Sequence, residues 1–248
     1  MALRIESAGK TDVGLVREKN EDSMLIDPTV GLYVVCDGMG GHVGGQVASQ
    51  LAVATISEVI RSANEPVPGD SGDADKVVTS IKAANNAVFS KAKADPSLHN
   101  MGTTVVAIRQ DADLLHLAHV GDSRIYRLRQ GKFEQVTRDH SLINLYEDNP
   151  ELAARFGPPN SNVIVRAVGL RDQVDVDHRV IAMEPSDMYL LCCDGLTDMV
   201  DDWMLKEMLA DAEHGSLDEA CEALVRAALS NGGVDNTTVI LLRIHEST

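Results

Sequence analysis

The chain has 248 residues, of which 44% are hydrophobic but only 3% are aromatic, so its core has to be built from aliphatic side chains. The formal net charge of −16 repels nucleic acid and anionic membranes, which argues against both as partners. No apolar run approaches the ~20 residues of a membrane span, and the start of the chain does not resemble a signal peptide. The four cysteines lack zinc-ligand spacing, so we expect reduced core cysteines in a cytoplasmic protein.

The hydrophobic periodicity predicts helices and strands in separate groups. Apolar side chains recur with helical spacing in four stretches, at 47–60, 77–88, 205–212 and 217–228. The first two are separated by residues 64–75, a surface loop rich in Pro, Gly and acids. Short strands are expected between the helical pairs, at 103–109, 114–122, 123–129 and 133–137. Their connections are too short for helical crossovers, which predicts an antiparallel meander and the α+β class.

Residues 138–170 do not fit either pattern. The stretch "SLINLYEDNPELAARF" is weakly helical, and "GPPNSN" interrupts it. A long irregular segment inside a compact domain is often functional, but a surface loop without a function explains it almost as well.

Two apolar strands end in the same three residues, Cys-Asp-Gly. "LYVVCDGMGGH" ends its apolar run at Asp37, and "YLLCCDGLTD" does so at Asp194. Gly121-Asp122 and Asp235-Asn236 also lie at strand ends. One such carboxylate is a common turn residue. Several carboxylates at the ends of apolar strands cost folding free energy unless an opposite charge offsets theirs, and a shared cation would do so. Because all of these ligands are oxygen atoms, Mg²⁺ or Mn²⁺ is favoured over Zn²⁺.

The stretch "VREKNEDS" carries Arg17, Glu21 and Asp22 just before a predicted strand. A solvated charge run is the default interpretation. Arginine beside a metal site is nevertheless the residue type that binds phosphate through two hydrogen bonds.

The histidines differ in their surroundings. His42 lies between glycines, which leave its imidazole unshielded, so we interpret it as a candidate general acid. His116 and His119 are three residues apart on a strand and therefore on opposite faces, so they cannot bind one metal and are interpreted as structural. His140, in "TRDHS", stays open. No cysteine is followed six residues later by arginine, as the cysteine phosphatases require.

Taken together, these residues resemble the metal-dependent serine/threonine protein phosphatases of type 2C, in the form of their bacterial catalytic domains. The resemblance extends from Gly9 to Ile244. It rests on a series of motifs in the order "GLVREKNEDS", "DGMGGH", "MGTTVV", "HVGDSRIYRL", "TRDHS", "VIVRAVG", "LLCCDGLTD" and "DNTTVI". It implies an antiparallel β-sandwich flanked by helices on both sides, with residues 1–248 forming a single catalytic domain.

The same resemblance implies a flap beside the active site, at about residues 138–168. The flap sequence departs from that of many bacterial relatives, which have a charged helical stretch ending in His-Pro. The substrate preference of those relatives is therefore not inferred for this protein from the flap.

The resemblance also implies two or three Mn²⁺ or Mg²⁺ ions at one end of the sandwich. Asp37 would bridge two of them, and the backbone carbonyl of Gly38 would bind one. Asp194 and Asp235 would complete the other site, and Asp122 with Asp194 matches a third, weaker site.

The remaining site residues would act around these ions. Glu21 and Asp22 would hold metal-bound waters, Arg17 would bind the substrate phosphate, and His42 would be the general acid. The implied reaction is hydrolysis of phosphoserine and phosphothreonine in signalling phosphoproteins by a metal-activated water. The substrates would be those of a cognate serine/threonine kinase, and the protein would act as a monomer.

Three alternatives stay open at this point. A metallophosphatase acting on small phosphoesters could use the same open site. A phosphoprotein-binding regulator without activity would need a lost metal ligand, whereas Asp37, Asp194 and Asp235 are all present. A simple acidic cation-binding protein explains the net charge but neither Arg17 nor His42.

Overall fold

The computed structural model describes residues 3–41, 43–63, 76–157 and 163–246. The N-terminal half contains β1 (Leu3–Asp12), β2 (Ser23–Asp27), β3 (Leu32–Cys36), β4 (Gly38–Met39), α1 (Gly44–Ala63), α2 (Lys76–Ala94), the 3-10 helix η2 (Pro96–Leu98), β5 (Gly102–Thr103), β6 (Val105–Asp111) and β7 (Leu114–Val120). The C-terminal half contains β8 (Arg124–Arg129), β9 (Lys132–Gln135), α3 (Leu142–Asp148), α4 (Pro150–Phe156), β10 (Asp177–Ala182), β11 (Met188–Cys192), α5 (Asp194–Thr197), α6 (Asp202–Asp211), α7 (Leu217–Ser230) and β12 (Thr237–Glu246).

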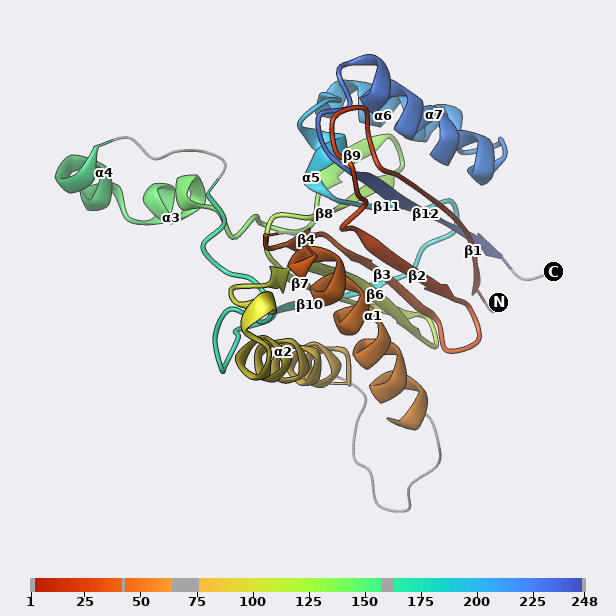
Figure 1. The fold of residues 1–248 in the computed structure, drawn as a ribbon. Coiled ribbons are helices and arrows are strands. Elements are labelled where there is room, and N and C mark those ends of the chain that lie inside the picture. Colours follow the sequence, from red (N-terminus) through yellow and green to blue (C-terminus); the bar gives the residue numbers. More distant parts are fainter. Residues whose placement is uncertain (1–2, 42, 64–75, 158–162, 247–248) are drawn as a thin grey trace.

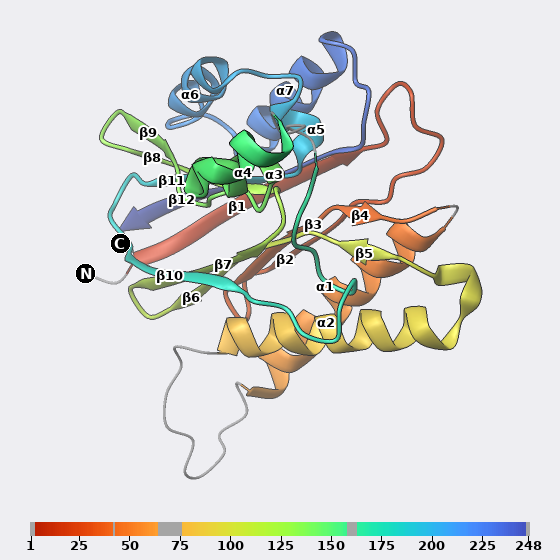
Figure 2. The same ribbon diagram turned by 90° about the vertical axis from the view of Figure 1, so that its left-hand side faces the viewer.

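The molecule has four layers, with two sheets packed face to face between two layers of helices (Figures 1 and 2). One five-stranded sheet has the order β1-β12-β11-β8-β9, and the other has the order β10-β7-β6-β3-β2. Helices α1 and α2 cover the second sheet, and α5, α6 and α7 cover the first (Figure 1). This confirms the predicted α+β class and the sandwich with helices on both sides.

The layered arrangement explains why the central strands are apolar on both faces. All five residues of β3 are buried. Leu32, Val34 and Cys36 point into the core below α1 and α2, whereas Tyr33 and Val35 point into the core between the sheets. A strand buried on both faces has no polar side to present to water, so its sequence reads as a continuous apolar run. The same holds for β11 in the other sheet.

The predicted meander is wrong at one connection. β6 pairs with β7 and β8 pairs with β9, both antiparallel as expected. However, β7 and β8 lie in different sheets. Strand β7 ends at Val120, short of the predicted residue 122, because Gly121 has a φ of +106° and turns the chain toward the other sheet. Residues 121–123 therefore cross between the sheets, which places Asp122 at the crossing.

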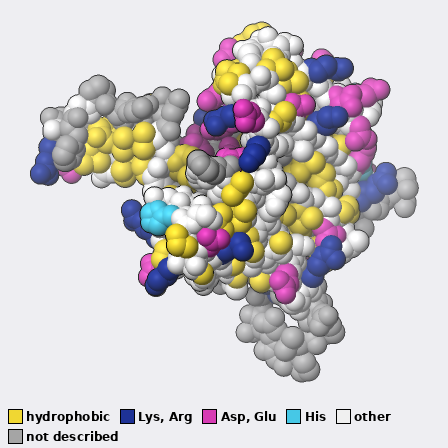
Figure 3. Space-filling model, in the orientation of Figure 1, with side chains coloured by type: hydrophobic (Ala, Val, Ile, Leu, Met, Phe, Trp, Pro, Cys, Tyr) yellow, Lys and Arg dark blue, Asp and Glu magenta, His cyan; other side chains and the backbone are white. Residues whose placement is uncertain are grey.

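The four predicted helices are present as α1, α2, α6 and α7. The weakly helical stretch forms α3 and α4, which project from the body of the molecule (Figure 1). Helix α3 exposes Ile143 and Leu145, each by 40%. Hydrophobic side chains are visible on this projecting part of the surface (Figure 3). All four cysteines are buried and unpaired, as the sequence predicts. Among the helices of the described residues, none has the length and apolarity that a membrane span requires.

Candidate active site

Six of the predicted site residues line one cavity at the end of the sandwich. Its volume is about 880 Å³, and its wall includes Arg17, Glu21, Asp37, Gly38, Asp194 and Asp235. Asp37 follows β3 in one sheet, and Asp194 follows β11 in the other by two residues. The two strands that end in Cys-Asp-Gly therefore deliver their carboxylates to the same place.

The backbone of Asp37 is held from both sides by neighbouring threonines. Its N–H donates to Thr104 Oγ1 at 2.9 Å, and its carbonyl oxygen accepts from Thr103 Oγ1 at 2.7 Å and from Thr104 N at 2.8 Å. These hydrogen bonds hold the backbone of Asp37, whose carboxyl group lines the cavity beside that of Asp194.

Gly38 is required by close packing. A Cβ at this position would lie 2.2 Å from the carbonyl oxygen of Gly45 and 2.5 Å from that of Glu21. Gly45 is similarly crowded, because its Cβ would lie 2.6 Å from Glu21 Oε2. Gly38 and Gly45 thus let the start of α1 approach the acidic cluster, which a side chain at either position would prevent.

Asp22 lies deeper than Asp37 and is only 8% exposed. One of its oxygen atoms, Oδ2, accepts a hydrogen bond of 2.6 Å from Thr238 Oγ1. Oδ1 is buried and makes no hydrogen bond. Ligand-type atoms of Asp22, Asp37 and Cys193 all lie within 4.8 Å of one another. Burial raises the pKa of the Cys193 thiol well above its ordinary value, so its sulfur stays protonated and the oxygen atoms are the better metal ligands.

Burial and mutual repulsion make the carboxylates of this cluster hard to ionise. Burial raises the pKa of Asp22 to about 6, and the charges of Asp194 and Asp235 add to the effect. The pKa of Asp37 lies well above its usual range because of burial and the nearby charges of Asp22 and Asp194. Burial also raises the pKa of Asp194. The cluster therefore lacks the positive charge that would keep all of its members ionised at neutral pH.

Arg17 lies at the rim of the cavity, where its Nη2 donates to Asp235 Oδ2 at 2.6 Å. The arginine side chain is 54% exposed, so the guanidinium is paired on one side and open to solvent on the other. An exposed arginine beside a group of carboxylates can bind an anion only if something offsets their negative charge.

Asn236 fastens the loop that carries Arg17. Its Nδ2 donates to the carbonyl oxygens of Val13 and Lys19 at 2.8 and 2.9 Å. Its Oδ1 accepts from the N–H of Glu21 at 2.8 Å. No role for Asn236 could be predicted from the sequence, because its partners lie more than 200 residues away along the chain.

Asp122 lies at the crossing between the sheets and has a buried Oδ1 without a hydrogen bond. Burial raises its pKa to about 7, and the charges of Asp194 and Asp139 contribute. Asp198, which the sequence analysis did not single out, is close enough to raise the pKa of Asp194 through its charge. Its position one helical turn after Asp194, in "DGLTD", is the signal by which it could have been found. His42 lies outside the described residues, so its predicted role stays a prediction.

The donor set fits divalent metal ions. Carboxylate oxygens from four separate parts of the chain converge, and Asp22 and Asp122 each keep a buried oxygen atom without a partner. Buried, unpartnered carboxylates with raised pKa values are costly, and a divalent cation would offset that cost. Oxygen ligands without a histidine among the described residues of the cavity wall suit Mg²⁺ or Mn²⁺.

Comparison with known proteins supports this chemistry. Residues 17–230 match the family model described as protein phosphatase 2C. The chain is 34% identical to the serine/threonine phosphatase stp of Listeria monocytogenes, and the match covers 94% of this chain and 93% of that protein. It is 35% identical to the serine/threonine protein phosphatase PstP of Mycobacterium tuberculosis over 97% of its own length, and spans 45% of the length of PstP.

A solved structure is similar over the whole fold. It is the crystal structure of the catalytic domain of PstP in complex with two manganese ions, with a TM-score of 0.83 and 34% sequence identity. The match covers 98% of this chain and all of that one.

Proposed function

Because this chain belongs to the protein phosphatase 2C family, we propose that it hydrolyses phosphoserine and phosphothreonine in proteins. The observation that carries the proposal is the convergence of Asp37, Asp194 and Asp235 with Arg17 around one cavity. Carboxylates that hold divalent cations next to an arginine that faces solvent form a site for a phosphate monoester.

We assign the carboxylates to metal binding. Asp37, whose backbone is held by Thr103 and Thr104, would bind the ions through its carboxylate. Asp194 and Asp235 would complete one site, and the carbonyl oxygen of Gly38 would serve the other. Glu21 and Asp22 would hold water ligands, and Asp122 with Asp194 would form a third site. Two or three Mn²⁺ or Mg²⁺ ions fit this set.

When bound, divalent ions activate water as a nucleophile near neutral pH and offset the charge of the phosphoryl oxygens. Arg17 binds two phosphoryl oxygens with its free N–H groups while Asp235 holds the guanidinium in place. The seryl or threonyl oxygen that leaves needs a proton, and His42 is the predicted donor. No cysteine takes part, since all four are buried and burial raises the pKa of each thiol.

The biological setting forms part of the same proposal. Residues 1–248 would act as one catalytic domain, with residues 138–168 as a flap next to the active site. The protein would act as a monomer in cytoplasmic signalling and reverse the action of a serine/threonine kinase. Four unpaired, buried cysteines are compatible with a reducing compartment.

The competing function is hydrolysis of small phosphoesters. The two are separated by comparing kcat/KM for a phosphoserine peptide with kcat/KM for a free phospho-sugar, both in saturating Mn²⁺. A protein phosphatase prefers the peptide, and a preference for the sugar would contradict the proposal.

A further inference from the structure

A second group of titratable side chains lies at the base of the flap segment (residues 138–168). His119, His140 and Asp177 bring three ligand-type atoms within 4.8 Å of one another. Arg166 already supplies a cation there, because its Nη1 lies 2.6 Å from Asp177 Oδ1 and 2.9 Å from His140 Nε2. The guanidinium takes the place that a metal ion would need, so the group is a hydrogen-bonded network.

His140 is joined to Gly121 by two hydrogen bonds in opposite directions. The N–H of Gly121 donates to His140 Nδ1 at 3.0 Å, and the N–H of His140 donates to the carbonyl oxygen of Gly121 at 2.9 Å. The imidazole is only 8% exposed and stacks on His119, with ring centres 4.6 Å apart. The ring is therefore held in one orientation.

The contact with Gly121 fixes the role of one ring nitrogen of His140. Because Nδ1 accepts from the N–H of Gly121, it carries no proton, while Nε2 faces Arg166 Nη1 at 2.9 Å and Asp177 Oδ1 at 3.4 Å. Burial, helped by the adjacent His119 and Arg166, lowers the pKa of His140 to about 4, so the ring is neutral at physiological pH. A proton on Nδ1 would lie directly against the N–H of Gly121.

His140 also joins the two ends of the flap segment. Its carbonyl oxygen accepts from the N–H of Val165 at 2.9 Å, and the N–H of Leu142 donates to Val163 at 2.8 Å. Ser141 and Ile164 form a β-bridge between these bonds. Ile164 lines the active-site cavity, so the geometry at His140 also places a side chain in that cavity.

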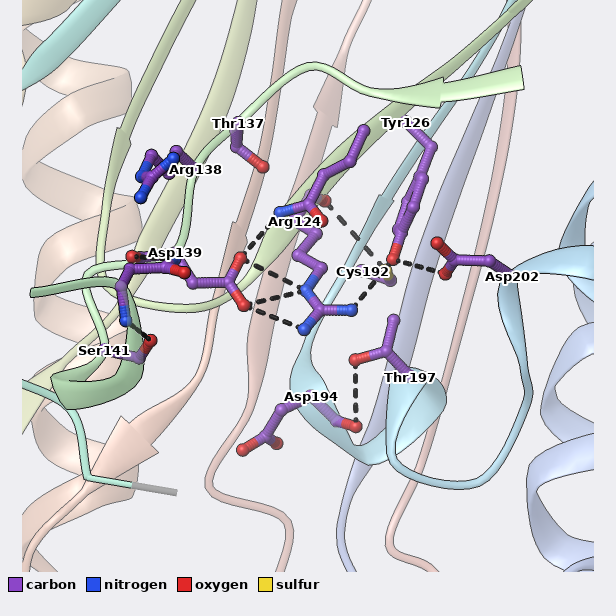
Figure 4. Close-up of polar contacts among 12 residues, drawn as sticks. Arg124, Tyr126, Thr137, Arg138, Asp139, Ser141, Cys192, Asp194, Thr197 and Asp202 are labelled. Atoms are coloured by element: carbon purple, nitrogen blue, oxygen red, sulfur yellow. Dashed lines mark hydrogen bonds and ion pairs between the residues drawn. The ribbon is translucent and has the colours of Figure 1, made fainter. Parts of the chain in front are cut away.

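Asp139, which precedes His140, is bound to strand β8 in the sheet that does not contain β7. Arg124, at the start of β8, donates to both carboxylate oxygens of Asp139 at 2.8 to 3.1 Å (Figure 4). The carbonyl oxygen of Asp139 accepts from Asn144 Nδ2 in α3 at 2.7 Å. Residues 139 and 140 thus fasten the flap segment to both sides of the crossing that carries Asp122.

We propose that His140 is a positioning residue that couples the flap segment to the Gly121–Asp122 turn. Its Nδ1 accepts a hydrogen bond from the N–H of Gly121, and its carbonyl oxygen accepts one from the N–H of Val165. Through these bonds it determines the positions of the Asp122 carboxylate and of Ile164 relative to the cavity. Its effect on turnover rests on the proposed phosphatase function, whereas its effect on the backbone does not.

Two substitutions separate the ring nitrogens. In His140→Asn, the amide oxygen lies near the position of Nδ1 and can still accept from Gly121. In His140→Gln, the amide reaches the position of Nε2 and leaves the N–H of Gly121 without an acceptor. Amide hydrogen exchange of the whole chain, resolved by NMR, should be about tenfold faster at Gly121, Leu142 and Val165 in the Gln variant. The Asn variant should stay within about threefold of the parent.

Asp177→Asn is the matched control, because it alters the contact at Nε2 and leaves Nδ1 unchanged. Exchange at Gly121 in this variant should also stay within about threefold of the parent. Equal exchange at Gly121 in the Asn and Gln variants, or an equal increase in Asp177→Asn, would overturn the assignment of Nδ1. This comparison holds even if the parent has no phosphatase activity.

Turnover provides the second measurement. In saturating Mn²⁺, kcat/KM for a phosphoserine peptide should fall about tenfold in His140→Gln and recover to within about threefold in His140→Asn. The rate for p-nitrophenyl phosphate, which makes few contacts beyond the phosphate, should fall less. Equal losses in the two variants would show that His140 only supports the fold. If the parent hydrolyses neither substrate, the proposed function fails while the exchange data still test His140.

Discussion

Replacing Asp122 by asparagine should stabilise the metal-free protein, and it should do so more strongly at pH 8 than at pH 5. The pKa of Asp122 is raised from 3.8 to about 7, mainly by burial and then by the charge of Asp194. A folded-state pKa above the unfolded value means that the folded protein holds this proton more tightly. The carboxyl group therefore costs no stability below about pH 4, and its cost grows until the pH passes about 7.

The size of the effect follows from the shift. About three pKa units correspond to about 4 kcal/mol once the pH is well above 7. At pH 5 the same group costs about 1.5 to 2 kcal/mol, so the advantage of Asp122→Asn should grow by about 2.5 kcal/mol between pH 5 and pH 8. For a chain of this size, that corresponds to an increase of about 5 to 10 °C in the difference between the two Tm values.

Thermal and denaturant unfolding of chelator-treated protein at both pH values would measure this. Asp113→Asn, at an exposed position in the turn between β6 and β7, is the control and should change the stability little at either pH. Excess Mn²⁺ should favour the parent, because it offsets the charge that makes the carboxylate costly. A stability difference between Asp122→Asn and the parent that does not change from pH 5 to pH 8 would contradict the raised pKa of Asp122.

Three further predictions concern turnover in saturating Mn²⁺. Asp37→Asn should lose more phosphatase activity than Asp122→Asn, since the first removes a bridge between two ions and the second a peripheral ligand; equal losses would contradict these assignments. Replacing residues 141–160 by a short Gly-Ser linker should impair phosphopeptide turnover more than that of an aryl phosphate, and identical effects would leave the segment without a role in substrate access. His42→Ala should slow a phosphopeptide by roughly 10²–10⁴-fold but an activated aryl phosphate much less. Across a series of aryl phosphates, its rates should depend more steeply on leaving-group basicity than those of the parent; matching slopes would mean that His42 only supports the glycine loop.

The sequence was most informative where burial alone determines the pattern. The continuous apolar runs of β3 and β11 could be recognised as strands, and the aspartates at their ends stood out because charge is costly there. The four longer helices followed from their periodicity. These features depend on neighbours along the chain, so the sequence predicts them directly.

Features that depend on distant partners could not be predicted in the same way. The crossing between β7 and β8 depends on which sheet each strand joins, and both sheets accept the same apolar pattern. β1 pairs with β12 at the other end of the chain, and that pairing brings Arg17 to Asp235. The role that we propose for His140 depends on Nδ1 meeting the N–H of Gly121 across 19 residues, for which the sequence gives no signal.

The metal dependence of phosphoserine hydrolysis tests the proposed function most directly. The chain would be stripped with a chelator, its metal content measured, and its turnover of a phosphoserine peptide recorded before and after addition of Mn²⁺ or Mg²⁺. We expect no turnover in excess chelator and recovery with either metal, because the carboxylates around Asp37 would activate water only through bound metal ions. Full activity in excess chelator, with no metal bound to the protein, would contradict it.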